Sequence, residues 1–302
     1  MVRRSTFLEH ARGLAWGAWA ELGVPGWVRS HKEWVIDPEP LIIFTAWLGD
    51  EDARLRDEAT DWCIANWRHV SKARLKNLLR DEPAEVEDAF GELSATVSKH
   101  AGIEWPARTS PRRHTVGGRT SLPTLERPSL GWLRMRAVFG LGVRAEILRV
   151  FLLPEVGRAS VGRLMALTGY GKRTVAEECE ELADAGVLAT RSVRNRLTYS
   201  LVREEPLLAL LGTIGAHRLD WVSLLAVVRE LVDLQEAVQQ SPERLVAVKV
   251  SNALGSIEDE LADLGIEVDE GTRPNDVWPT LERRAGRKLS DWAAGEWRPL
   301  VT

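Results

Sequence analysis

Apolar residues recur at helical spacing through most of the first 105 residues. Residues 51–68, for example, place Leu55, Ala59 and Trp62 on one stripe, as an amphipathic helix does. The helices that this pattern predicts span 5–22, 38–48, 51–68, 72–80 and 83–101. We therefore expect a helical N-terminal domain over 1–105. An effector pocket among its many Trp residues is the alternative to a plain core that they fill, and the plain core is favoured.

The helix expected over 72–80 is capped by Ser71 and is rich in cations. Lys72, Arg74, Lys76 and Arg80 follow one another at short spacing, with acidic residues close by on either side. They hint at a second helix-turn-helix, but a solvated helix face is the favoured interpretation.

Helical periodicity stops at residue 106. Residues 106–129 hold four prolines, a Gly-Gly pair and five arginines against a single acid, which predicts a basic linker. Its arginines could form an arm in the minor groove of DNA, although a solvated linker is favoured. The arginines concerned are Arg108, Arg112, Arg113 and Arg119.

Shorter elements follow the linker. Ser160 is placed to cap one helix, Gly169-Tyr170-Gly171 to form a tight turn, and Gly186 to end the next helix. The predicted elements are helices at 130–138, 144–153, 161–168 and 172–185, and strands at 187–191 and 196–201. This order is that of a winged helix-turn-helix with a two-stranded β wing, which we expect over 130–202.

Beyond residue 203 the pattern is helical again, which completes a mainly α fold with a helical C-terminal region over 203–302. The predicted helices span 205–213, 221–239, 242–265 and 277–295. Helix 221–239 has a wide apolar face that needs a partner helix. Either helix 242–265 or a second subunit could cover it, and we expect a homodimer built through this region.

The formal net charge of −4 is distributed unevenly. Residues 106–202 carry 16 basic and 8 acidic side chains, a net charge of +8, whereas 1–105 and 203–302 carry −5 and −7. A cationic middle between acidic flanks suggests a polyanionic partner.

Cysteine and histidine usage gives no metal site. The chain has only Cys63 and Cys179, no CxxC motif, and six scattered His. This excludes a disulfide framework and fits a reducing, cytoplasmic compartment. The longest apolar stretch, 207–216, is well short of the about 20 residues that cross a membrane.

Two stretches imitate enzyme motifs. Residues 140–145 (GLGVRA) resemble a dinucleotide fingerprint but lack a preceding strand, and 171–174 (GKRT) resemble the end of a P-loop with Arg173 intruding. We therefore expect no enzyme, no catalytic residues and no cofactor.

The segment 143–202 carries the sequence Ser160–Tyr170 (SVGRLMALTGY), then KRTV at 172–175, LADAGVL at 182–188 and the closing YSL at 199–201. Over about 60 of 302 residues it resembles bacterial winged-helix transcriptional regulators of the ArsR and MarR kinds. The resemblance implies binding to double-stranded DNA. Helix 172–185 would lie in the major groove, where Lys172, Arg173 and Thr174 at its start meet the bases.

The resemblance also places the wing, 187–201, on the phosphate backbone or in the minor groove. Three arginines and no acid stand on it, namely Arg191, Arg194 and Arg196. Ser160 and Tyr170 would donate hydrogen bonds to backbone phosphates.

The same helix carries five acids, namely Glu177, Glu178, Glu180, Glu181 and Asp184. Carboxylates near phosphates cost affinity, so either only the first turn reaches the bases or the domain binds a protein. The second alternative is an adaptor or antitoxin-like protein whose winged helix does not bind DNA and whose acidic helices hold a partner. A winged helix that only packs within the chain is the third.

Overall fold

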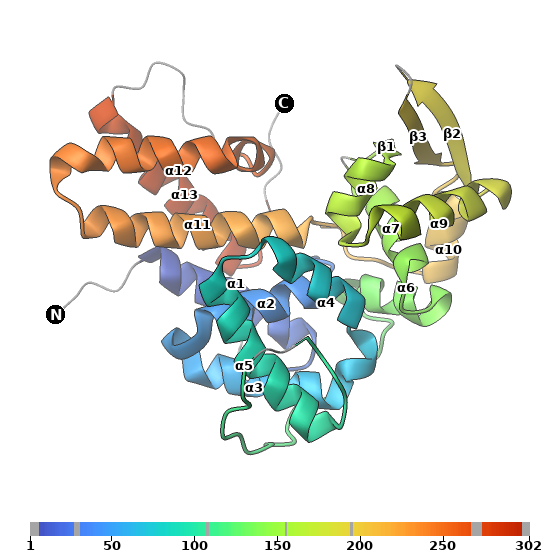
Figure 1. Cartoon of the computed structure of the whole chain (residues 1–302), viewed down its shortest axis with the longest axis horizontal. Helices are drawn as coiled ribbons and strands as arrows, with labels where there is room; N and C mark the ends of the chain where they lie inside the picture. The colour runs from blue at the N-terminus through green and yellow to red at the C-terminus, as the bar shows by residue number, and fades with distance from the viewer. Residues whose placement is uncertain are drawn as a thin grey trace. The chain divides into compact units, whose positions relative to one another are not determined.

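The computed structural model describes residues 6–26, 31–106, 109–154, 156–193, 196–266 and 274–297. The chain divides into two compact units (Figure 1). The terminal unit comprises 1–20, 27–31 and 221–302, and the central unit comprises 21–26 and 32–220. These units do not follow the predicted domain boundaries at 105/106, 129/130 and 202/203, which stay predictions.

The terminal unit is built from long helices. Its elements are α1 (Thr6–Glu21), α11 (Trp221–Gln239), α12 (Glu243–Asp263) and α13 (Pro274–Ala293). The apolar face of α11, including Leu224, Val228 and Leu231, is buried against α12 and α13. The Phe7 N–H of α1 also donates a 3.0 Å hydrogen bond to Gln235 of α11. Helices of the same chain thus cover the face that suggested a second subunit, so this face no longer argues for a homodimer.

The central unit begins with four packed helices. These are α2 (Pro38–Leu48), α3 (Ala53–Asn66), α4 (Lys72–Leu78) and α5 (Ala84–Ala101). Short 3-10 turns lie at Gly49–Asp52, Trp67–His69, Leu79–Asp81 and Pro128–Leu130. As expected, Ser71 caps α4, because its Oγ accepts a hydrogen bond from the Arg74 N–H at 3.2 Å. The predicted mainly helical fold is confirmed.

The basic segment after α5 has no helix or strand over 109–127, yet it is attached to α3. Arg112 pairs with Asp57 and Arg119 pairs with Glu58. Asp61 accepts hydrogen bonds from His114 Nε2 and from the Gly117 N–H, both at 2.7 Å. Two of the arginines considered for a minor-groove arm are therefore engaged by acids of α3, and Arg108 lies outside the described residues.

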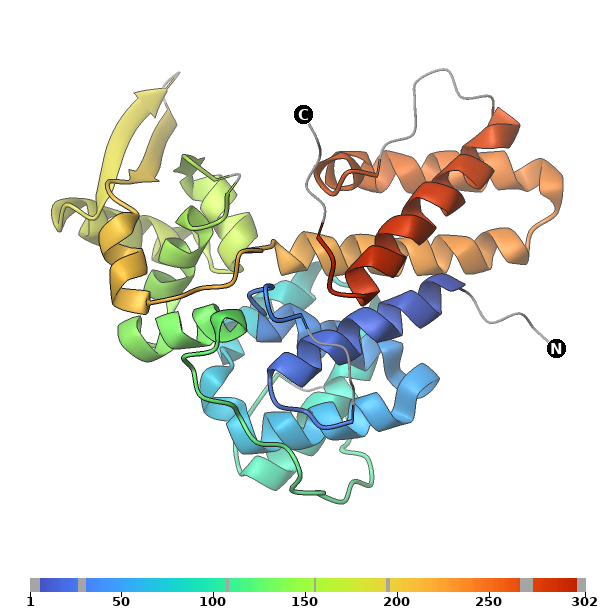
Figure 2. The same cartoon turned by 180° about the vertical axis from the view of Figure 1, so that it is seen from behind.

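The remaining elements of the central unit surround a small sheet. The helices are α6 (Gly131–Phe139), α7 (Val143–Phe151), α8 (Val161–Thr168), α9 (Lys172–Asp184) and α10 (Glu205–Leu211). The strands are β1 (Ala159–Ser160), β2 (Leu188–Val193) and β3 (Arg196–Leu201), antiparallel in the order β1-β3-β2. The sheet has three strands where two were expected, because β1 is too short to show an alternating pattern. The β2–β3 hairpin extends beyond the neighbouring helices (Figure 1 and Figure 2).

Candidate nucleic-acid interface

Helices α8 and α9 are joined by a tight turn. Ser160 begins α8 by accepting a hydrogen bond from the Arg163 N–H, and the Gly169 N–H ends it by donating to the Met165 carbonyl. Gly169 has φ +70°, a left-handed conformation that glycine adopts without strain. Two residues later, Gly171 returns to extended φ and ψ of −69° and 153° and starts α9. The chain therefore reverses within three residues, as the sequence predicted.

The first turn of α9 carries exposed polar side chains. Lys172, Arg173 and Thr174 are all exposed, whereas Val175 and Cys179 are buried in the core. Arg173 donates a 2.7 Å hydrogen bond to Glu177 one turn later. Arg173 is thus paired within the helix, whereas Lys172 has no ion-pair partner among the described residues.

Carboxylates dominate the rest of the exposed surface of α9, but three of the five have cationic partners. Glu177 pairs with Arg173. Glu178 and Glu181 pair with Arg144 of α7, at 2.5 and 3.0 Å. Glu180 and Asp184 are exposed and have no ion-pair partner in the described part of the chain. The negative charge that remains lies beyond the first turn of α9.

The β2–β3 hairpin presents its arginines on one face. Leu188, Thr190 and Ser192 alternate with Ala189 and Arg191 along β2, and Leu188 is buried. Arg191 is paired in register with Thr198 and Val193 with Arg196, so Arg191 and Arg196 are diagonal neighbours on the face away from Leu188 and Tyr199.

Both hairpin arginines are exposed, and neither has an ion-pair partner in the described ranges. This gives the hairpin a cationic face. Arg194, the third predicted wing arginine, lies outside the described residues.

The two hydroxyl groups predicted to meet phosphate are engaged within the protein. Ser160 Oγ caps α8. The Tyr170 hydroxyl lies 2.8 Å from Ser71 Oγ, and burial raises the pKa of Tyr170. Both side chains therefore have structural roles in positioning the α8–α9 turn.

Behind this turn lies a buried network of three arginines and three carboxylates, each at most 4 % exposed. Its members are Asp37, Glu39, Arg74, Arg136, Glu146 and Arg149. They come from the start of α2 and from α4, α6 and α7. The charges balance, as they must because an uncompensated charge in a protein interior is very costly.

Glu39 and Glu146 each accept hydrogen bonds from two arginines, and Arg136 donates to both of them. Glu39 accepts 2.7 Å hydrogen bonds from both Arg74 and Arg136. Glu146 accepts hydrogen bonds from Arg136 at 2.7 Å and Arg149 at 2.8 Å. Although burial alone raises the pKa of Glu146, the guanidinium groups, Arg136 foremost, hold it well below its ordinary value. The Glu146 carboxylate is therefore ionised at neutral pH.

Two arginines of the network also hold the end of α8. Arg74 Nε donates to the Thr168 carbonyl oxygen at 3.1 Å, and an Arg149 NH2 group donates to the Leu167 carbonyl oxygen at 2.8 Å. The last carbonyls of a helix have no partner within the helix, so these bonds satisfy them. Arg74 and Arg149 thus link the buried network to the end of α8, just before the turn from which α9 starts.

The network was not predicted from the sequence, in which a solvated face was the favoured interpretation for Arg74. Arg74 is instead fully buried, because acids distant in sequence surround it. One local pattern pointed to the network: Glu146 and Arg149 are three residues apart within the apolar stretch of α7, and both are buried.

Comparison of the chain with protein-family models, with curated proteins and with solved structures gave no match. Within the described ranges, no group of His, Cys, Asp and Glu side chains is arranged to hold a metal ion. None of the described helices is long and apolar enough to cross a membrane.

Proposed function

We propose that the central unit contains a winged helix-turn-helix that binds double-stranded DNA, and that the protein regulates transcription in the cytoplasm. The observation that carries the proposal is the order of elements around the α8–Gly169–α9 turn, followed by a projecting hairpin with a cationic face. In a winged helix the second helix of the turn meets the major groove and the hairpin meets the backbone.

The distribution of exposed charges indicates which parts of the winged helix-turn-helix would contact DNA. Lys172, Arg191 and Arg196 are exposed cations without ion-pair partners in the described part of the chain, so they are available to phosphates or bases. Glu180 and Asp184 further along α9 would repel phosphates. The proposal therefore assigns DNA contacts to the first turn of α9 and to the hairpin, with the later turns of α9 tilted away.

Binding of a labelled mixed-sequence duplex, followed by fluorescence anisotropy over a salt series, tests the proposal. We expect Arg191→Ala/Arg196→Ala to weaken binding and to lower the steepness of log K against log [salt] by about 1.8, since each lost phosphate contact removes about 0.9. Arg244→Ala/Lys249→Ala removes two exposed cations of α12 and is the matched control. No salt-dependent binding by the unaltered protein would overturn the proposal.

A protein-binding module is the second candidate, favoured by the unpaired carboxylates Glu180 and Asp184 on the exposed side of α9. In that case Glu180→Gln/Asp184→Asn would abolish capture of a protein from native extract, and no duplex would bind. Recovery of DNA with the unaltered protein, insensitive to these two substitutions, would count against this candidate.

A further inference from the structure

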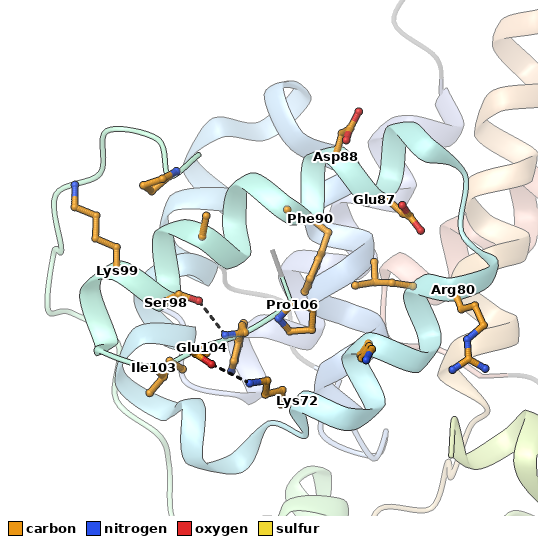
Figure 3. Close-up of a pocket in the computed structure, with 16 residues that line it drawn as sticks. Lys72, Arg80, Glu87, Asp88, Phe90, Ser98, Lys99, Ile103, Glu104 and Pro106 are labelled. Carbon is orange, nitrogen blue, oxygen red and sulfur yellow. Dashed lines mark hydrogen bonds and ion pairs between the residues drawn. The ribbon is translucent and has the colours of Figure 1, made fainter. Parts of the chain in front are cut away.

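The central unit contains a pocket of about 910 Å³ between α4, α5 and the chain at 103–106 (Figure 3). Pockets of about 300–1,000 Å³ are the size that holds small molecules in proteins. Neither the turn before α9 nor the hairpin contributes to its lining. It is therefore separate from the proposed DNA interface.

Large apolar side chains form its inner wall. Phe90, Leu79 and Trp105 line it and are all buried. In Figure 3, Phe90 points from α5 toward Pro106. The Trp105 N–H donates a 3.0 Å hydrogen bond to Ser98 Oγ, which ties the 103–106 segment to α5. The wall is thus pre-formed and suits a flat, ring-sized apolar body.

Cations outnumber acids on the lining, four to three. Lys72 pairs with Glu104 at 3.8 Å, and both side chains are more than half exposed. Lys76 and Lys99 have no ion-pair partner among the described residues, and Arg80 donates to Asn77. Glu87 and Asp88, both from the first part of α5, are the other acids. Lys72 and Lys76 of α4 therefore offer the clearest site for an anionic group.

The other side of α4 contacts the turn before α9. Ser71, adjacent to Lys72, is hydrogen-bonded to the Tyr170 hydroxyl, and Arg74 holds the Thr168 carbonyl. A Cβ atom at Gly169 would lie 3.3 Å from side-chain atoms of Arg74 and Leu78. One helix of seven residues thus separates the pocket from the α8–α9 turn.

We propose that this pocket binds a small molecule with an aromatic body and a carboxylate, and that α4 couples its occupancy to the α8–α9 turn. The ligand carboxylate replaces Glu104 as the partner of Lys72, the first residue of α4. Because Ser71 precedes Lys72 and holds Tyr170, the change in pairing reaches the turn directly. The binding stands on the pocket alone, whereas an effect on DNA affinity rests on the proposed function.

Titration calorimetry with 2-naphthoate, and with uncharged 2-naphthylmethanol of the same ring size, tests the binding. We expect Lys72→Gln/Lys76→Gln to weaken 2-naphthoate about tenfold and to leave 2-naphthylmethanol within about twofold. Arg244→Gln/Lys249→Gln on α12 is the matched control and leaves both unchanged. Ala95→Leu places a larger side chain in the pocket and weakens both probes. Absent binding of 2-naphthoate, or binding indifferent to these pocket substitutions, overturns the proposal.

Hydrogen exchange of the amides of 168–174, with and without saturating 2-naphthoate, tests the coupling without DNA. We expect their exchange rates to change by at least about twofold, and Ser71→Ala to remove this change while 2-naphthoate still binds. Unchanged exchange in the unaltered protein at saturation overturns the coupling. The duplex anisotropy assay, repeated with 2-naphthoate, is a separate arm: if no duplex binds, the proposed function fails while the pocket and its coupling are judged by calorimetry and exchange.

Discussion

Arg74 Nε donates a 3.1 Å hydrogen bond to the carbonyl oxygen of Thr168, 94 residues further along the chain. The same guanidinium group donates to Asp37 and to Glu39, so one side chain joins α2, α4 and the end of α8. The orientation of the α8–α9 turn therefore depends on α2 and α4 as well as on the backbone of the turn itself. The start of α9 is therefore anchored, through the end of α8, to α2 and α4.

Replacing Arg74 with Met leaves Asp37 and Glu39 short of a buried cation. We expect Arg74→Met to lower the free energy of unfolding by about 3–5 kcal/mol, as found when one partner of a buried ion pair is removed. Arg80→Met, at an exposed position just after α4, is the matched control and changes it by less than about 0.5 kcal/mol. Urea unfolding followed by circular dichroism measures the free energy of unfolding of both variants. If Arg74→Met lowered it as little as Arg80→Met does, the network would not stabilise the fold.

The buried carboxylates make stability fall in acid. Burial alone raises the pKa of Asp37, but Arg74 and then Arg149 hold it below its ordinary value, and the pKa of Glu146 is lowered likewise. As the pH falls, the unfolded chain therefore takes up protons before the folded chain does, and unfolding is favoured. The stabilisation is fully present above about pH 5 and is lost progressively below about pH 4.

Carboxyl ¹³C shifts measure this effect directly. In the folded protein the Asp37 and Glu146 signals stay at their ionised values at about pH 4, where the same groups in the urea-unfolded chain are half protonated. Titration of both groups at the same pH in the folded and unfolded chains would show that the guanidinium groups do not stabilise their charges.

Gly169 is required by its backbone conformation. We expect Gly169→Ala to cost about 1–2 kcal/mol, because an L-residue at φ +70° is strained and the added Cβ would press on Arg74 and Leu78. Gly171→Ala is the control within the same turn, since Gly171 has φ −69° and a Cβ added there would meet no atom within 4 Å. Thermal unfolding of the two variants measures the difference, and equal melting temperatures would refute the argument.

Both thiols are expected to be unreactive in the folded protein. Burial, followed by the charges of Glu178 and Glu180, raises the pKa of Cys179 to about 12, and burial also raises that of Cys63. Since the thiolate is the reactive form, Ellman's reagent at about pH 8 should label neither thiol until denaturant is added. Rapid labelling of one thiol without denaturant would place it at the surface.

The helices were predictable because each has a clear apolar stripe or cap: α11 spans 221–239 in both the prediction and the structure, and Ser71 caps α4. The buried charges were not, because local sequence makes Arg74 resemble its exposed neighbours Lys72 and Lys76. Its burial follows from Asp37 and Glu39, which only the tertiary fold brings near. The β1 strand has two residues and depends on pairing with β3.

Neutralising the unpaired carboxylates of α9 distinguishes two ways in which this helix could lie on DNA. If the helix lies along the groove, Glu180→Gln/Asp184→Asn removes two repulsive charges and strengthens duplex binding about two- to fivefold, on the order of 0.5–1 kcal/mol. If only the first turn and the hairpin touch DNA, as we propose, the gain is less than about twofold, because charges beyond a Debye length of about 8–10 Å are screened. Anisotropy titration at physiological salt separates the two outcomes. Glu236→Gln/Glu243→Gln, at exposed positions of α11 and α12, is the control for a general change in net charge.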